Sequence, residues 1–171
     1  MEYQIRPLRK SDNRENFNSS HTDLDLFFAR YAGQNQFRHH IGVTYVATND
    51  SVILGFITLA MGSIETQSVP KIKIPGNYPL PVLRLGRMAV DRNYQGLGIG
   101  KQLLRYALLL ALQQKSIMGC VGVVVDIKAE AVVFYEKFGF QVIEQPLEGG
   151  VRGNPPPRPM FLPMQSISAT P

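Results

Sequence analysis

Three glycines at alternate positions, followed at once by a leucine-rich segment, form the pattern in this chain that points most directly to chemistry. Gly96, Gly98 and Gly100 follow a mostly apolar run that ends at Asp91, and a helical pattern of leucines and alanines occupies residues 99–114. The first backbone N–H groups of a helix have no partner within the helix and carry partial positive charge. A glycine-rich entry lets an anion approach these donors closely. The pattern therefore predicts a strand, a phosphate-binding loop and a helix, in that order.

Two common phosphate-binding motifs do not fit this loop. A Walker motif, G-x-x-x-x-G-K-[ST], would need a glycine at Gln95 and a hydroxyl residue at Gln102, so it is excluded. A dinucleotide-binding motif, G-x-G-x-x-G, that starts at Gly96 would need its third glycine where Lys101 stands. The chain also offers only one strand–helix–strand unit of that kind, which disfavours a dinucleotide.

The elements around the loop follow from periodicity and turn residues. The predicted helices are residues 22–35, 99–114 and 129–138, and the predicted strands are residues 3–7, 43–48, 52–60, 83–90, 121–125, 141–143 and 160–164. We expect Thr22 or Asp23 to cap the first helix and Gly139 to end the third. Gly55 indicates a bulge or a close backbone approach within its strand.

Four further expectations concern the environment of two of these elements and the loops between them. The helix at 99–114 is apolar nearly all round, so it is expected to be sandwiched between other elements, and the valine run at 121–125 is expected to be covered on both faces. Residues 62–81 contain four prolines and no clean period, which favours a long loop on the substrate side. Residues 148–158 are a second Gly- and Pro-rich loop.

Composition limits the class of protein. A chain of 171 residues fits one domain, here residues 1–165, with a flexible tail at 166–171. The 18 Lys and Arg against 13 Asp and Glu give a formal charge of +5, which favours a polyanionic ligand without naming one. Cys120 is the only cysteine, so an internal disulfide is excluded and a reducing cytoplasm is expected. Neither a signal peptide nor a membrane-spanning segment is expected.

Two sequence motifs, one following the other along the chain, indicate a known family. Residues 95–100 match the pattern Q/R-x-x-G-x-G/A, and residues 134–140 read F-Y-x-x-x-G-F. With these motifs the chain resembles the GCN5-related N-acetyltransferases (GNAT), which bind acetyl-CoA, over nearly its whole length. The resemblance implies an α/β (α+β) fold with a mixed central sheet of about six to seven strands flanked by helices. It also implies that the strand carrying residues 88–90 splays from the strand carrying residues 123–126.

The resemblance further implies roles for individual residues. Backbone amides of the loop would cradle the CoA pyrophosphate, and the splayed strand would bind the pantetheine arm. The implied CoA-binding residues are Met88, Ala89, Val90, Gln95, Gly96, Leu97, Gly98, Ile99, Gly100 and Lys101. The N–H of Met88 or Ala89 is the candidate oxyanion donor. Tyr135 matches the family's general acid for the departing thiolate, whereas periodicity alone favours a packed aromatic residue there.

No general base stands out in the sequence. Glu65 and Asp91 are candidates, although Asp91 fits better as the residue that ends its strand or caps the turn. The neighbouring His39 and His40 fit a solvated pair, and no metal site is expected. A substrate amine with a low pKa would need no dedicated carboxylate.

A narrower resemblance concerns the acceptor. Five segments are similar to the GNAT toxins of toxin–antitoxin operons, namely residues 24–28, 44–47, 55–60, 85–91 and 160–164. Such toxins acetylate the α-amine of aminoacyl-tRNA, which stops translation, and a ribbon-helix-helix antitoxin neutralises them. The candidate tRNA-binding residues are Arg38, Lys71, Lys73, Arg84, Arg87 and Arg92.

Two other functions stay open at this point. One is a GNAT enzyme that acetylates a small-molecule amine or a protein N-terminus. The other is a catalytically silent protein that binds acetyl-CoA or an antitoxin partner. The sequence also leaves open which amino acid or tRNA is acetylated, and whether the chain forms a homodimer.

Overall fold

The computed structural model describes residues 1–66, 69, 78–143 and 156–167, which divide into two compact units. Unit 1 comprises Met1–Ala60 and Leu85–Ala107, and unit 2 comprises Met61–Arg84 and Leu108–Pro171. The chain therefore passes from one unit to the other three times, within two strands and one helix.

Seven strands form a sheet in the order β1-β2-β3-β4-β5-β7-β6. Their bounds are β1 Gln4–Pro7, β2 Val43–Thr48, β3 Ile53–Ile64, β4 Leu80–Val90, β5 Gly122–Ile127, β6 Gln141–Val142 and β7 Arg158–Pro163. Strands β1, β2 and β3 pair antiparallel, and so do β5, β7 and β6. Neighbours β4 and β5 are joined by a helical crossover, which is the connection that parallel strands require. The predicted α/β class, with a mixed sheet of six to seven strands, is confirmed.

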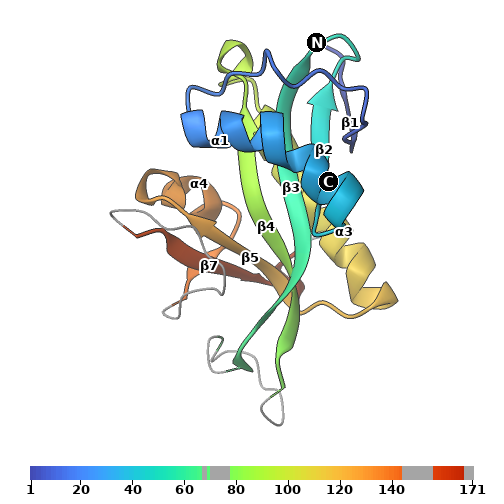
Figure 1. The fold of residues 1–171 in the computed structure, drawn as a ribbon. Helices are drawn as coiled ribbons and strands as arrows, with labels where there is room; N and C mark the ends of the chain where they lie inside the picture. The colour runs from blue at the N-terminus through green and yellow to red at the C-terminus, as the bar shows by residue number, and fades with distance from the viewer. Residues whose placement is uncertain (67–68, 70–77, 144–155, 168–171) are drawn as a thin grey trace. The chain divides into compact units, whose positions relative to one another are not determined.

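One continuous helical segment packs on the sheet of unit 1. It consists of α1 (Thr22–Leu26), the π-helical η1 (Phe27–Tyr31), α2 (Ala32–Gln34) and the π-helical η2 (Asn35–His39). It lies across one face of β3 and β4, and the first half of α3 (Ile99–Ile117) lies on the other (Figure 1). The N-cap is His21, whose carbonyl accepts a hydrogen bond from the amide of Asp25. The expected capping by Thr22 or Asp23 is wrong, because both residues already lie inside the first turn.

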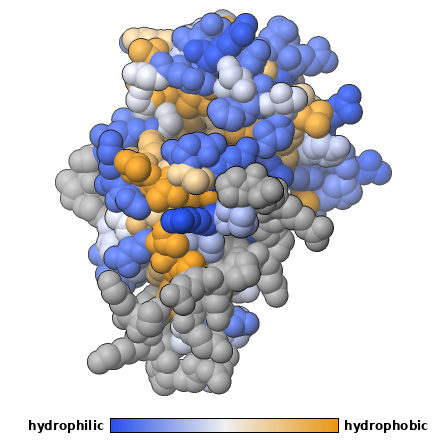
Figure 2. Space-filling model, turned by 90° about the vertical axis from the view of Figure 1, so that its left-hand side faces the viewer, coloured by the Kyte–Doolittle hydropathy of each residue, from blue (hydrophilic) through white to orange (hydrophobic). Residues whose placement is uncertain are grey.

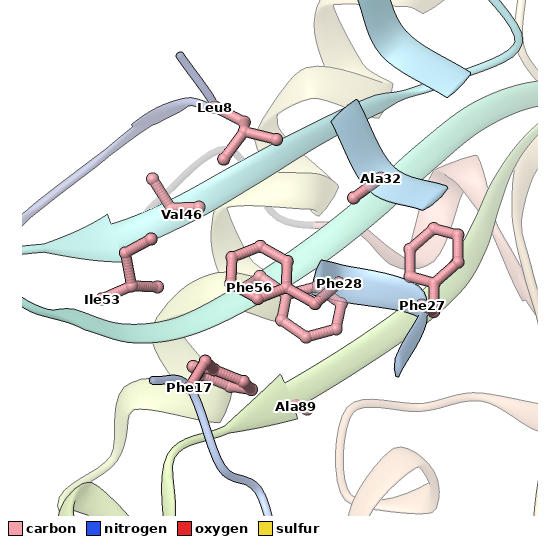
Figure 3. Packing of buried hydrophobic residues seen from close by; sticks show 9 residues of the cluster. All are labelled: Leu8, Phe17, Phe27, Phe28, Ala32, Val46, Ile53, Phe56 and Ala89. Carbon is pink, nitrogen blue, oxygen red and sulfur yellow. The ribbon is translucent and has the colours of Figure 1, made fainter. Parts of the chain in front are cut away.

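Aromatic stacking holds that helical segment on the strands (Figure 3). The rings of Phe28 and Phe56 stack with centroids 4.4 Å apart and an interplanar angle of 2°, and Phe17 meets both rings edge-on. The cluster consists of Leu8, Phe17, Phe27, Phe28, Ala32, Val46, Ile53, Phe56 and Ala89. Burying a large aromatic side chain contributes roughly 1.5–3 kcal/mol, so this cluster fixes the helix relative to β3 and β4.

Unit 2 has its own core around β5. Val123, Val124 and Val125 are all at most 2% exposed, so successive side chains on both faces are covered, as the valine run predicted. The 3₁₀ turn η5 (Ala129–Ala131) leads into α4 (Val132–Glu136), and Gly139 follows with φ 95°. The amide of Gly139 donates to the carbonyl of Glu136, which confirms that the glycine ends this helix. The 3₁₀ turn η6 (Met164–Ser166) and the buried Ile167 end the described chain.

Two expectations about helix and loop environments are wrong. Helix α3 buries a single stripe, and Leu109 on another side is 47% exposed, so the helix is not sandwiched. The buried stripe consists of Ile99, Leu103, Leu104, Ala107 and Ala111. The long loop expected at 62–81 is shorter at both ends, because β3 continues to Ile64 and β4 begins at Leu80. Ile64 and Val82 bury their side chains in the core of unit 2, which extends both strands despite the prolines.

The surface mixes polar and apolar side chains in both units. Figure 2 shows one face on which apolar residues (orange) are exposed between hydrophilic ones (blue). Large exposed apolar side chains include Tyr31 and Leu97 in unit 1, and Met118 and Val133 in unit 2. Within the described ranges, no helix has the length and apolar character that crossing a membrane would take.

Candidate functional site

Asp91 ends strand β4 and starts the turn that leads to the glycine loop. Its side chain is buried, with the residue 5% exposed. One carboxylate oxygen accepts from the amide of Asn93 at 3.0 Å, and the other accepts from the amide of Asn18 at 3.1 Å. The predicted role as a cap is confirmed. Because both oxygens are occupied by backbone amides, Asp91 is poorly suited to act as a general base.

The glycine loop has the backbone geometry of an anion site. Gly96 and Gly98 have φ values of 80° and 83°, a region that residues with side chains rarely adopt. A Cβ atom at either glycine would meet nothing within 4 Å, so the space beside the loop is open. The amide of Gln102 donates to the carbonyl of Gly98, and the amides of Ile99 to Lys101 precede that first helical bond. Open space beside unpaired helix-initial amides is what a phosphate group requires.

Tight packing against β3 and β4 sets the position of this loop. A Cβ at Gly55 would lie 3.0 Å from the carbonyl oxygen of Ala89 and 3.1 Å from the side chain of Leu103. Contacts this short are tighter than most real Cβ contacts, so the glycine favours the close approach of the strands and α3. The register of the β2–β3 pair also shifts between Ala47 and Thr48, so both the close approach and the irregularity expected near Gly55 are present.

The side chain of Gln95 anchors the start of the loop. Its Nε2 donates to the carbonyl of Val90 at 3.0 Å and to the carbonyl of Ser19 at 3.1 Å. The motif predicts Gln95 only as part of the CoA-binding loop, and no pattern in the sequence indicates Ser19, which lies 76 residues away. The side chain of Gln95 is thus engaged by the protein, and its backbone is the part left for a ligand.

The described candidates among the predicted substrate-binding cations belong to both units. Arg87 in β4 is half-buried, and its guanidinium lies 4.1 Å from the centre of the Phe27 ring, a cation–π contact. Arg38 and Arg92 are exposed in unit 1, and the half-buried Arg84 belongs to unit 2. The two other candidates, Lys71 and Lys73, lie outside the described residues, as does most of the loop at 148–158.

Tyr135 lies in α4 of unit 2 and is 5% exposed. Its ring meets Phe134 at 5.1 Å and Phe140 at 5.4 Å between centroids, both edge-on. Burial raises the pKa of the phenol well above its ordinary value. The packed-aromatic interpretation is therefore confirmed, and the hydroxyl stays protonated at neutral pH, which is the form that donates a proton. Its role at the thiolate stays a prediction, as does the splay between residues 88–90 and 123–126, because these segments lie in different units.

Glu65 and the histidine pair, the remaining candidates, lie at the surface. Glu65, the other candidate base, is exposed in unit 2. His39 is exposed, with its Nε2 3.2 Å from the amide nitrogen of Gln34. Within the described part of the chain, no group of three or more His, Cys, Asp or Glu side chains could hold a metal ion.

Comparison with known proteins decides the family. The model of the acetyltransferase (GNAT) domain matches residues 40–142, which include the glycine loop and Tyr135. The chain belongs to the GNAT family. It is 32% identical over 141 residues to a tRNA-acetylating toxin of Mycobacterium tuberculosis (strain ATCC 25618 / H37Rv), an alignment that covers 80% of this chain and 83% of that toxin.

Solved structures of GNAT proteins have the same fold. AtaT complexed with acetyl-methionyl-tRNAfMet superimposes with a TM-score of 0.83 at 25% identity, covering 97% of each chain. A mutant of the AtaT toxin bound to the C-terminus of the antitoxin AtaR and to acetyl-CoA gives a TM-score of 0.77 at 23% identity, covering 96% of this chain and 95% of that one. These GNAT relatives therefore align with this chain along nearly its whole length.

Proposed function

We propose that this GNAT chain is an acetyl-CoA-dependent N-acetyltransferase that acetylates the α-amine of aminoacyl-tRNA, acting as the toxin of a toxin–antitoxin pair. The observation that carries the proposal is the 32% identity to a tRNA-acetylating toxin along four fifths of both chains. The structural relative AtaT, solved with acetyl-methionyl-tRNAfMet, supports the same class of acceptor. Because charged tRNA is cytoplasmic, we assign the chain to the cytoplasm.

The donor is acetyl-CoA, and the glycine loop is its proposed pyrophosphate site. Support comes from the positive φ values of Gly96 and Gly98 and from the open space beside them. The amides that precede the first hydrogen bond of α3 would donate to the phosphate oxygens. We further assign Met88, Ala89 and Val90 of β4 to the pantetheine arm, in line with the family resemblance.

The reaction requires four changes at the thioester. The neutral amine attacks the carbonyl carbon, and the resulting oxyanion accepts a hydrogen bond, for which we assign the N–H of Met88 or Ala89. The carbon–sulfur bond then breaks, and the new amide nitrogen loses a proton to water. The departing thiolate gains a proton from the hydroxyl of Tyr135, which solvent reprotonates. Support for Tyr135 comes from its place in the motif F-Y-x-x-x-G-F, within the residues that the GNAT model matches.

The acceptor would be held by cationic side chains. The formal charge of +5 favours contact with the tRNA backbone. Among the candidates, Arg87 is the most ordered by its surroundings, since its guanidinium lies over the ring of Phe27. We also propose a small ribbon-helix-helix antitoxin as partner. Support comes from AtaT, whose structure includes the C-terminus of the antitoxin AtaR.

Incubation with labelled acetyl-CoA and charged tRNA tests the proposal. We expect label on the aminoacyl moiety, released by mild alkaline hydrolysis of the ester as an N-acetyl amino acid. Uncharged tRNA and tRNA already N-acetylated on its amino acid serve as matched acceptor controls and should take up no label. Transfer to free amines or protein N-termini, with none to charged tRNA, would replace the toxin assignment by another acetyltransferase activity.

A further inference from the structure

A set of hydrogen bonds connects the glycine loop to the start of the first helix within unit 1. The loop contributes Gln95, whose side chain donates to the carbonyl of Ser19 at 3.1 Å. Ser19 in turn donates twice to one oxygen of Asp25 in α1, from its amide at 2.9 Å and from its hydroxyl at 2.7 Å. Ser19 is 1% exposed, whereas Asp25 is half-buried and Gln95 is exposed. Loop and helix are thus joined through two steps that meet at the buried Ser19.

The chain beside Ser19 is held in an unusual conformation. Ser20 has φ 71°, which costs a residue with a side chain roughly 1 kcal/mol, and its amide donates to the side chain of Asn18 at 2.9 Å. The amide of Asn18 donates to Asp91 at 3.1 Å, and the carbonyl of Asn18 accepts from the amide of Arg92 at 2.8 Å. A strained residue persists only where its surroundings fix it. Residues 18–20 therefore form a fixed support on which the entry to the loop rests.

We propose that Ser19 and Asp25 are positioning residues for the donor pyrophosphate: through Gln95 they hold the glycine loop in the conformation that binds acetyl-CoA. The inference rests on the proposed function of the loop and deepens it. Loss of the carboxylate of Asp25 leaves the amide of Ser19 without its acceptor, and the Ser19 hydroxyl keeps the longer bond to the carbonyl of His21 at 3.4 Å. The carbonyl that receives Gln95 then loses its fixed place, and the amides at the helix start lose their alignment. Asp25 and Ser19 need no contact with the donor for this effect.

The test compares two ligands that differ at the pyrophosphate. CoA carries it, whereas pantetheine ends before it, and binding of each is measured by calorimetry on the full chain without any acceptor. We expect Asp25→Ala to weaken CoA binding about tenfold and to leave pantetheine binding unchanged. Asp25→Asn keeps an acceptor oxygen and should bind CoA within about twofold of the wild type. Glu15→Ala removes an exposed carboxylate of the same N-terminal region and controls for the change of charge.

Gln95→Met tests the same connection from the loop side. It removes both donated bonds at nearly constant side-chain length, and it leaves the first helix intact if Asp25→Ala does not fold. The same selective loss of CoA binding is expected. An equal loss for CoA and pantetheine, or no loss in either variant, would overturn the positioning role. A wild type that binds CoA no better than pantetheine would instead refute the pyrophosphate site, and with it this part of the proposed function.

Discussion

The glycine loop and the surroundings of Tyr135 are built in opposite ways. The loop exposes backbone, and its conformation is set by two glycines at positive φ and by the hydrogen bonds of Gln95. Tyr135 is a side chain enclosed by the rings of Phe134 and Phe140, and burial raises its pKa. The spacing of residues alone identifies the first kind of site, because few residue types permit that backbone conformation. The second kind depends on an environment that spacing does not reveal.

Removal of the Tyr135 hydroxyl is the strongest way to test this contrast. General acid catalysis contributes roughly 100-fold or more, so Tyr135→Phe should lower kcat for acetyl transfer by at least about 100-fold. Affinity for acetyl-CoA should stay unchanged, because the pyrophosphate loop is intact. Single-turnover kinetics with labelled acetyl-CoA and calorimetric titration measure the two quantities separately.

Tyr106→Phe is the matched control for that variant. Tyr106 is a half-buried phenol on α3 that packs beside Tyr45 at 5.1 Å between ring centres, and we assign it no part in the chemistry. Its loss should leave kcat within about twofold. A full rate in Tyr135→Phe would refute the acid role and reduce Tyr135 to a packing residue.

A side chain placed in the loop should instead affect donor binding. Gly98→Ala puts a Cβ at φ 83°, which costs about 1–2 kcal/mol of folding stability, and also displaces the neighbouring amides. We expect KM for acetyl-CoA to rise about tenfold, with kcat at saturation little changed. Steady-state kinetics over a range of acetyl-CoA concentrations measures both.

Gly119→Ala is the control that separates an effect on acetyl-CoA binding from the cost of backbone strain. Gly119 follows the end of α3 with φ 87°, and a Cβ there also meets nothing within 4 Å. The two variants should lose similar stability in denaturant titrations, and only Gly98→Ala should raise KM. A similar rise in both would mean that the effect comes from general destabilisation, and that the loop has no special role.

The same contrast explains which features were predictable from the sequence. Hydrophobic periodicity and turn residues act over a few positions. They predict all seven strands, the three helical regions, the cap at Asp91 and Gly139 as the residue that ends its helix. The first helix is predicted to end near residue 35, yet it continues to His39 through the π-helical turn η2. Two bonds of the Gln36 side chain, to the carbonyl of Leu8 and from the amide of Thr44, hold this turn beside β2, and a helical pattern carries no mark of them.

Contacts distant in sequence account for the other failures. Residues 62–64 and 80–81 are predicted to lie in a loop because of nearby prolines and the lack of a clean period, but burial of Ile64 and Val82 extends both strands. Helix α3 is predicted to be sandwiched because its own leucines occur on nearly all its sides, but only one stripe of its side chains is buried. Ser19 and its bonds to Gln95 and Asp25 escaped prediction altogether, since a serine that accepts and donates across 76 positions has no local pattern.

The smallest expected effect is a pH dependence of stability that belongs to Tyr135. Its pKa is raised in the folded protein, so the folded state keeps the phenol proton at pH values where the unfolded chain loses it. Stability from this group is complete below the unfolded pKa of about 10 and declines above it, by about 1.4 kcal/mol near pH 11. Phenylalanine has no phenol proton to lose, so Tyr135→Phe removes this decline. From about pH 9 to about pH 11, the unfolding free energy of the wild type should therefore fall relative to that of the variant. Urea titrations of the wild type and of Tyr135→Phe at each pH measure it. Parallel curves for Tyr135→Phe and wild type would mean that water reaches the phenol, and the contrast between an enclosed acid and an open loop would then fail.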